Sequence, residues 1–234
     1  MTNSATQLPA GFRPAFVAAD RLMLGILAVG ALVSVALGTE YGRLGLALAG
    51  SLVLLGLGAG AYALARGQFG TRLILAFAAA ATVALHIQLS MGTLEYHFGV
   101  FVTLAFLLIY RDWRVIVFTA AVFAVHHVAF DRLQFGGLPV YCLSTPDFGK
   151  ILIHAGFVVA QTAVEVLMAR WMHQQALAGY ELADLVEAIE ADGQLNLNLS
   201  GLRVASGPAQ HLQAALARVQ EGMRQIQQAT ESIS

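Results

Sequence analysis

The sequence predicts an all-α protein: a polytopic membrane bundle of six helices followed by cytoplasmic helices. Three observations predict this class. Of the 234 residues, 58% are hydrophobic and only 12% are charged, whereas about a quarter of the residues in a soluble domain are charged. The mean hydropathy is +0.69, and the apolar runs are near the ~20 residues that a helix needs to cross a bilayer. Polar residues return after residue 171 and continue to the end of the sequence.

Charge and cysteine content exclude several classes of protein. The formal net charge is −1, so bulk electrostatics indicate neither a nucleic acid nor an acidic partner. The single cysteine, Cys142, excludes an intrachain disulfide and a cysteine-rich metal site. The N-terminal segment MTNSATQLPAGFRPAF is polar and differs from a signal peptide. We therefore expect residues 1–19 to form a separate N-terminal segment.

The six expected spans form one domain, residues 20–171, and membrane lipids surround it. They lie at residues 20–38, 43–65, 72–91, 95–110, 114–134 and 149–170. The second span is rich in glycine, which lets membrane helices approach one another closely.

Flanking basic residues predict the orientation of these spans. One side carries Arg13, Arg21, Arg66, Arg72, Arg111, Arg114 and Arg170, and the other carries Arg43, Arg132 and Lys150. By the positive-inside rule the first side is cytoplasmic, and so are both chain termini. Tyr110 and Trp113 are expected as aromatic anchors at this interface.

The residues after 171 predict cytoplasmic helices with two breaks, at Asp192-Gly193 and within GLRVASGPAQ. Residues 172–207 would form a connector and residues 208–234 the start of a coiled coil. In the last segment, apolar residues recur at alternating steps of four and three, with a single polar member. These positions are Leu212, Leu216, Val219, Met223, Ile226, Thr230 and Ile233. Such a seam needs a partner helix, so we predict a homodimer.

Five of the seven histidines fall in the expected spans. They are His86, His97, His126, His127 and His154, from four different helices. Counted from the inner arginines at 1.5 Å per residue, all five and Glu95 lie roughly 18–24 Å deep. Ionisable groups are costly in hydrocarbon and usually face a cavity or one another. This common depth predicts one functional cluster.

Imidazole is a preferred ligand for copper, zinc and iron. The predicted metal ligands are His86, His97, His126, His127, His154 and Glu95, with copper favoured and iron or zinc possible. Because the sequence lacks HExxH and CxxC motifs, the ligands must converge from different helices. His126 and His127 point about 100° apart on a helix, and which of them binds directly stays open.

Four further residues are predicted to support this cluster. Met91 offers a soft thioether. Asp131 follows His127 by four residues and either orients its ring or pairs with Arg132 or Lys150. Gln161 and Glu165 share one face of the last span, where Glu165 either relays a signal or bonds a neighbouring helix. Cys142, in the expected outer loop, is either incidental or a soft metal relay.

Other functions compete with a directly ligated metal. Two facing histidines can bind haem b, histidines can hydrogen-bond a quinone, and the cluster can be the centre of a membrane metal oxidoreductase. A haem needs only two of the five histidines, however, and the sequence shows no dedicated base or nucleophile motif. A metal-binding protein that is not an enzyme is therefore favoured.

Several segments resemble a known family. HIQLSMGTLEYHFGVFVTLAFLLIYRDWR, followed by AVHHVAF and LIHAGF, resembles a six-helix membrane input domain of bacterial methyl-accepting chemotaxis receptors and of some other signalling proteins. The likeness covers residues 72–170. AIEADGQLNLNL is similar to the start of a HAMP connector, with Asp192-Gly193-Gln194 in place of its Gly-Asp-Leu. GMRQIQQATESIS resembles the opening of a chemoreceptor signalling helix, just before the methylation region.

The resemblance implies a transmembrane chemoreceptor of the bacterial inner membrane. The chain would end before the methylation and kinase-coupling regions, through which such receptors engage a chemotaxis kinase and a coupling protein. Combined with the histidine cluster, this predicts a sensor in which a metal-linked redox, oxygen or metal signal passes to the cytoplasmic coiled coil.

Overall fold

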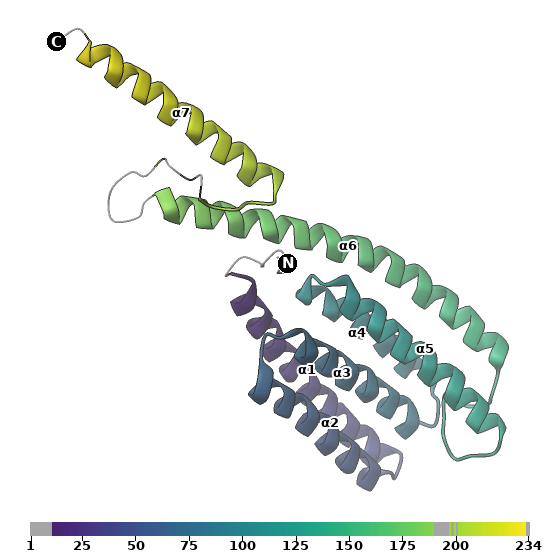
Figure 1. Cartoon of the computed structure of the whole chain (residues 1–234). Helices are drawn as coiled ribbons and strands as arrows, with labels where there is room; N and C mark the ends of the chain where they lie inside the picture. The colour runs from purple at the N-terminus through teal and green to yellow at the C-terminus, as the bar shows by residue number, and fades with distance from the viewer. Residues whose placement is uncertain (1–10, 190–196, 198, 200, 233–234) are drawn as a thin grey trace, which may run out of the picture. The chain divides into compact units, whose positions relative to one another are not determined.

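A computed structural model describes residues 11–189, 197, 199 and 201–232, and within these residues the chain is helical with no strand. The helices, in order, are α1 (Phe12–Glu40), α2 (Leu44–Ala65), α3 (Phe69–Leu89), η1 (Leu94–His97), α4 (Phe98–Phe106), η2 (Leu107–Tyr110), α5 (Trp113–Phe135), α6 (Phe148–Ile189) and α7 (Gly207–Glu231) (Figure 1). The predicted all-α fold class is confirmed.

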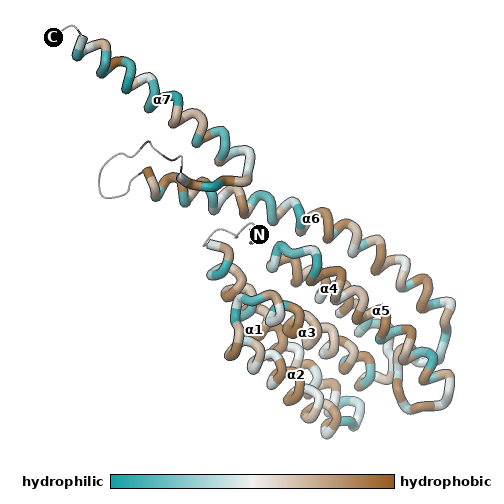
Figure 2. The backbone as a smooth tube through the Cα atoms, in the orientation of Figure 1, coloured by the Kyte–Doolittle hydropathy of each residue, from teal (hydrophilic) through white to brown (hydrophobic). Residues whose placement is uncertain are grey.

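Five of these helices are long and apolar enough to cross a membrane: α1, α2, α3, α5 and α6. The fourth expected span is shorter and composite, because η1 and η2 flank the nine residues of α4. Figure 2 shows the apolar character of the bundle helices and the more polar character of α7. The chain therefore has the helices of a membrane protein.

The chain divides into two compact units. Residues 13–171 form the bundle, and residues 1–12 with 172–234 form the second unit. Helix α6 contributes residues to both. The predicted break at Asp192-Gly193 and the last seam position, Ile233, lie outside the described residues.

Glycines of α2 allow close packing at particular positions only. A Cβ added at Gly50 would lie 2.8 Å from Leu85 of α3, and one at Gly58 would lie 2.9 Å from Leu27 of α1. At Gly45, Gly56 and Gly60 an added Cβ would meet nothing within 4 Å. The glycine-rich sequence thus contributes to packing through only some of its members.

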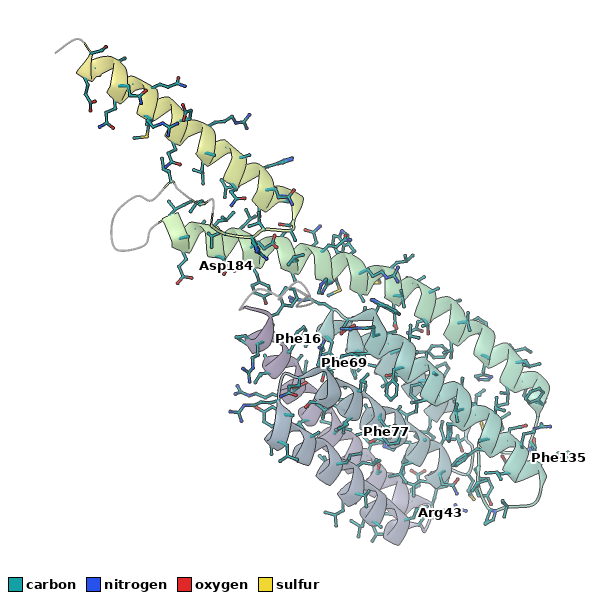
Figure 3. The ribbon with its side chains drawn as sticks, in the orientation of Figure 1. Phe16, Arg43, Phe69, Phe77, Phe135 and Asp184 are labelled. Carbon is teal, nitrogen blue, oxygen red and sulfur yellow. The ribbon has the colours of Figure 1, made fainter. Side chains whose placement is uncertain are left out.

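Buried polar groups connect the helices at the end of the bundle that holds Arg72. The Arg72 guanidinium donates to Asp112 at 2.9 Å, and Arg114 contacts the same carboxylate at 2.8 Å. The Tyr110 hydroxyl donates to Asp20 at 2.9 Å. Tyr110 is fully buried, so its expected role as an interfacial anchor is wrong. Figure 3 shows Phe16 and Phe69 at this end of the bundle and Arg43 at the other end.

The second unit has its own small core. Leu185, Leu199 and Ala209 are its buried centre. Glu181 of α6 accepts backbone N–H bonds from Ala205 and Ser206 at 2.8 and 2.7 Å, just before α7 begins. These two bonds fix the start of α7 against the C-terminal part of α6.

Candidate metal centre

Three potential ligands converge at the bundle end closed by the α5–α6 loop, residues 136–147. They are His97 at the end of η1, His127 in α5 and Cys142 in the loop, and one ligand atom from each lies within 4.8 Å of the others. All three residues are buried, and Cys142 is completely so. Such a group can hold a metal ion.

The histidine rings share one orienting contact. In each of His97, His127 and the neighbouring His154, Nδ1 lies near the carbonyl oxygen four residues earlier. The three acceptors are Thr93, Phe123 and Lys150, at 3.2, 2.8 and 3.0 Å respectively. Because a carbonyl only accepts hydrogen bonds, each Nδ1 carries the proton, and each neutral ring keeps a lone pair on Nε2. Metal-ligating histidines are usually oriented in this way.

His97 in particular has an unused ligand atom. Its side chain is 98% buried, with a relative exposure of 2%, and its Nε2 has no hydrogen-bond partner. A buried polar atom without a partner carries a desolvation cost of about 1–3 kcal/mol. A bound cation would remove that cost.

Glutamines from two helices fold the α5–α6 loop back over the histidines. Gln134 accepts from the Cys142 amide at 3.1 Å and donates to the Leu143 carbonyl at 2.7 Å. Gln88 of α3 accepts from the Tyr141 amide at 2.8 Å and donates to the Pro139 carbonyl at 3.1 Å. These four bonds hold the backbone on both sides of the thiol.

Gly92 permits the closest approach to this loop. Its φ is +81°, and an added Cβ would lie 2.2 Å from the Leu143 carbonyl carbon. No other residue type fits without moving the loop, since both the backbone angle and the space require glycine. Gly92 therefore helps to place Cys142.

Burial raises the pKa of the Cys142 thiol to about 12, and the nearby Asp131 carboxylate adds to the effect. The free protein therefore carries a neutral thiol at this position at pH 7. A metal would bind as the thiol loses its proton.

His154 and His126 lie beside the group. The ring of His154 is 5.8 Å from that of His97, and the ring of His126 is 5.2 Å from that of His127, between ring centroids. His126 packs against Phe130 at 4.3 Å, and its Nε2 has no hydrogen-bond partner. Neither residue belongs to the convergent set of three.

The structure does not bring three other predicted ligands or helpers to this group. His86 donates from Nε2 to the Gly30 carbonyl of α1 at 2.9 Å, so it joins α3 to α1. Glu95 is exposed in the first turn of η1. Met91 is also exposed, with a left-handed φ of 56° at the end of α3.

The predicted supporting residues bond other partners. Asp131 accepts from the Asp147 amide at 3.0 Å and pairs with Arg132, which corresponds to the second of its two expected roles. Gln161 donates to the Phe101 carbonyl at 3.1 Å and to Glu165 at 2.6 Å. Glu165 is buried in α6, and its Oε2 has no partner.

An apolar cavity of about 530 Å³ adjoins the histidines, between α6 and the pair α4 and α5. Its polar lining residues are His97, His127, His154 and Thr162, and the others are apolar.

Comparison of the chain with known protein families, curated proteins and solved structures gives no match. The function is therefore argued from the site itself.

Proposed function

We propose that the protein is a membrane sensor that holds a transition-metal ion on His97, His127 and Cys142. The observation that carries this proposal is the convergence of these three buried side chains within 4.8 Å. The Nε2 lone pairs of the two histidines support it, as does the absence of a partner for Nε2 of His97.

Copper is the favoured ion. Two imidazoles and one thiolate suit copper, and they are also compatible with zinc or iron. Three protein ligands leave an open coordination position. When bound, the metal would supply a redox-active or ligand-accepting centre next to the apolar cavity.

A sensory role rests on the sequence as well as on the site. The likeness to chemoreceptor input domains favours an inner-membrane protein with cytoplasmic termini, dimeric through α7. Such a receptor would act on a chemotaxis kinase. A signal requires that the occupied and empty site favour different conformations.

Metal analysis of the purified full chain tests the proposal. We expect wild type to bind copper stoichiometrically, and His97→Ala, His127→Ala and Cys142→Ala to lose most of it. His211→Ala, in α7, is the matched control and should bind like wild type. Equal metal content in all five proteins would overturn the proposal. An intense Soret band in wild type would instead identify haem.

A further inference from the structure

The cavity beside the histidines has the form of a site for a long, thin molecule. Its lining on α6 runs from Ile151 to Val166, which corresponds to roughly 22 Å along the helix. Its volume of about 530 Å³ lies within the range of small-molecule sites, about 300–1,000 Å³. The cavity therefore has room for a ring with an alkyl tail.

Polar atoms concentrate at one end of this cavity. His97, His127 and His154 line the end nearest the α5–α6 loop, and the walls beyond them are apolar apart from Thr162. Thr162 lies about 12 Å along α6 from His154, which is too far to touch the same ring. An occupant therefore has one polar head and a long apolar remainder.

The histidine tautomers define the chemistry of that head. Nδ1 of His154 donates to the Lys150 carbonyl, so its Nε2 presents a lone pair and accepts hydrogen bonds. His154 lies outside the group of three proposed metal ligands, so this lone pair stays available when a metal is bound. A hydroxyl donor matches it, whereas a quinone carbonyl or an alkyl chain does not.

We propose that the cavity binds a lipophilic phenol of the quinol class. Its hydroxyl donates to Nε2 of His154, and its alkyl tail lies along α6 toward Val166. The inference rests on the proposed function only in assigning His97 and His127 to the metal.

The test compares two probes of the same shape: decylphenol and its methyl ether, which lacks the O–H donor. Saturable binding to the purified full chain is measured, and metal content is determined on the same samples. We expect wild type to prefer the phenol by about tenfold, the effect of one hydrogen bond. His154→Phe should remove the preference and retain the metal, while the control His211→Phe should keep both.

Four outcomes overturn this inference: equal binding of the two probes by wild type, a preference retained in His154→Phe, a preference retained in Ala155→Leu, or loss of metal together with the preference. Ala155→Leu fills the cavity and should abolish saturable binding of both probes. Ala49→Leu, at an exposed position of α2, should bind both probes like wild type. If wild type contains no metal but prefers the phenol, and His154→Phe removes that preference, the metal proposal is refuted and the phenol proposal is supported.

Discussion

At the scale of single residues, the position of the Cys142 thiol depends on a contact that involves no side chain. Gly92 faces the Leu143 backbone at a distance where a methyl group cannot fit. The loop and the end of α3 are thus matched to each other through their main chains. Any side chain at position 92 must separate them.

We predict that Gly92→Ala weakens copper binding by at least tenfold without removing a ligand. The added methyl group would push the loop, and with it Cys142, away from the histidines, and a left-handed φ adds about 1 kcal/mol or more of strain. Competition with a chelator of known affinity measures the change. Gly70→Ala, where an added Cβ meets nothing within 4 Å, is the control. Unchanged affinity in Gly92→Ala would show that the loop does not set the site.

Depth along the helices predicts part of the histidine arrangement from the sequence. It placed His97, His127 and His154 at one level, and their rings do lie in a chain of contacts less than 6 Å apart. Depth does not define the direction in which a ring points around its helix. His86 has a similar depth, yet its ring faces α1.

The sequence leaves Cys142 open, as either an incidental thiol or a soft metal relay. Its position depends on Gln88 and Gln134, which bond the loop from two helices that are distant in sequence. Loop conformations set by such tertiary contacts have no local sequence pattern. The one sequence feature that points to Cys142 is that a soft potential ligand follows the span that carries His126 and His127.

At the scale of elements, α3 and α5 are joined at the Arg72 end by an ion pair with little solvent contact. Burial alone would raise the pKa of Asp112, but hydrogen bonds from Arg114 and the charges of Arg114 and Arg72 lower this pKa below its usual range. A carboxylate with a lowered pKa contributes stability above its unfolded-state pKa. That contribution is lost as the pH falls through the folded-state pKa.

Asp112→Asn should therefore be less stable than wild type by a constant amount from pH 7 to pH 5. The difference should shrink as the pH falls below about 4, because Asp112 then gains a proton in the unfolded chain, and it should be lost once the folded-state carboxyl also becomes neutral. Thermal unfolding of the detergent-solubilised proteins across this range measures it. A difference that persists unchanged at pH 3 would contradict the assignment.

Arg72→Met tests the same link from the other side. Removing one partner of a buried ion pair costs about 3–5 kcal/mol, because the remaining charge stays desolvated. Arg114 still contacts Asp112, so we expect the lower part of that range. The free energy of unfolding is the measurement, and Arg66→Met at the α2–α3 turn is the control. A cost near zero would mean that Arg114 alone satisfies Asp112.

The sequence predicts where helices occur better than it predicts where each helix begins and ends. The sequence predicts one helix over residues 95–110, whereas this segment forms α4 between two 3-10 turns. The first turn brings His97 to its position at the cavity. Helical periodicity does not distinguish a 3-10 turn from an α-helical one over four residues.

The start of α7 should depend on Glu181. Glu181→Gln replaces one acceptor oxygen with an amide group, so one of the Ala205 and Ser206 N–H groups loses its partner. We expect a loss of about 1–2 kcal/mol in the second unit, seen as faster hydrogen exchange at these amides. Glu187→Gln, at an exposed position of the same helix, should exchange like wild type. Equal rates in both variants would exclude this capping role.

At the scale of the whole molecule, α7 presents an apolar seam that its own unit covers only in part. Leu212 and Leu216 pack against the small core. Val219, Met223 and Ile226 are 52, 57 and 70% exposed. A second copy of α7 would cover them, as the heptad spacing predicts.

We predict that Ile226→Glu shifts the purified protein from dimer to monomer, because the variant places two like charges in an apolar seam. Light scattering, corrected for bound detergent, measures the mass of the protein in each particle. Gln228→Glu introduces the same charge outside the seam and should remain dimeric. Identical masses for both variants would argue against dimerisation through α7.

The orienting contacts of the three histidines have a consequence for mutational tolerance. Their acceptors are main-chain carbonyl groups, which are present whatever side chain occupies positions 93, 123 and 150. Ring orientation is thus insensitive to most substitutions at neighbouring positions, unlike a site whose histidines are held by carboxylates. In a library of variants, the positions essential for metal retention should be few: the ligands themselves, Gly92, and the two glutamines that hold the loop, Gln88 and Gln134.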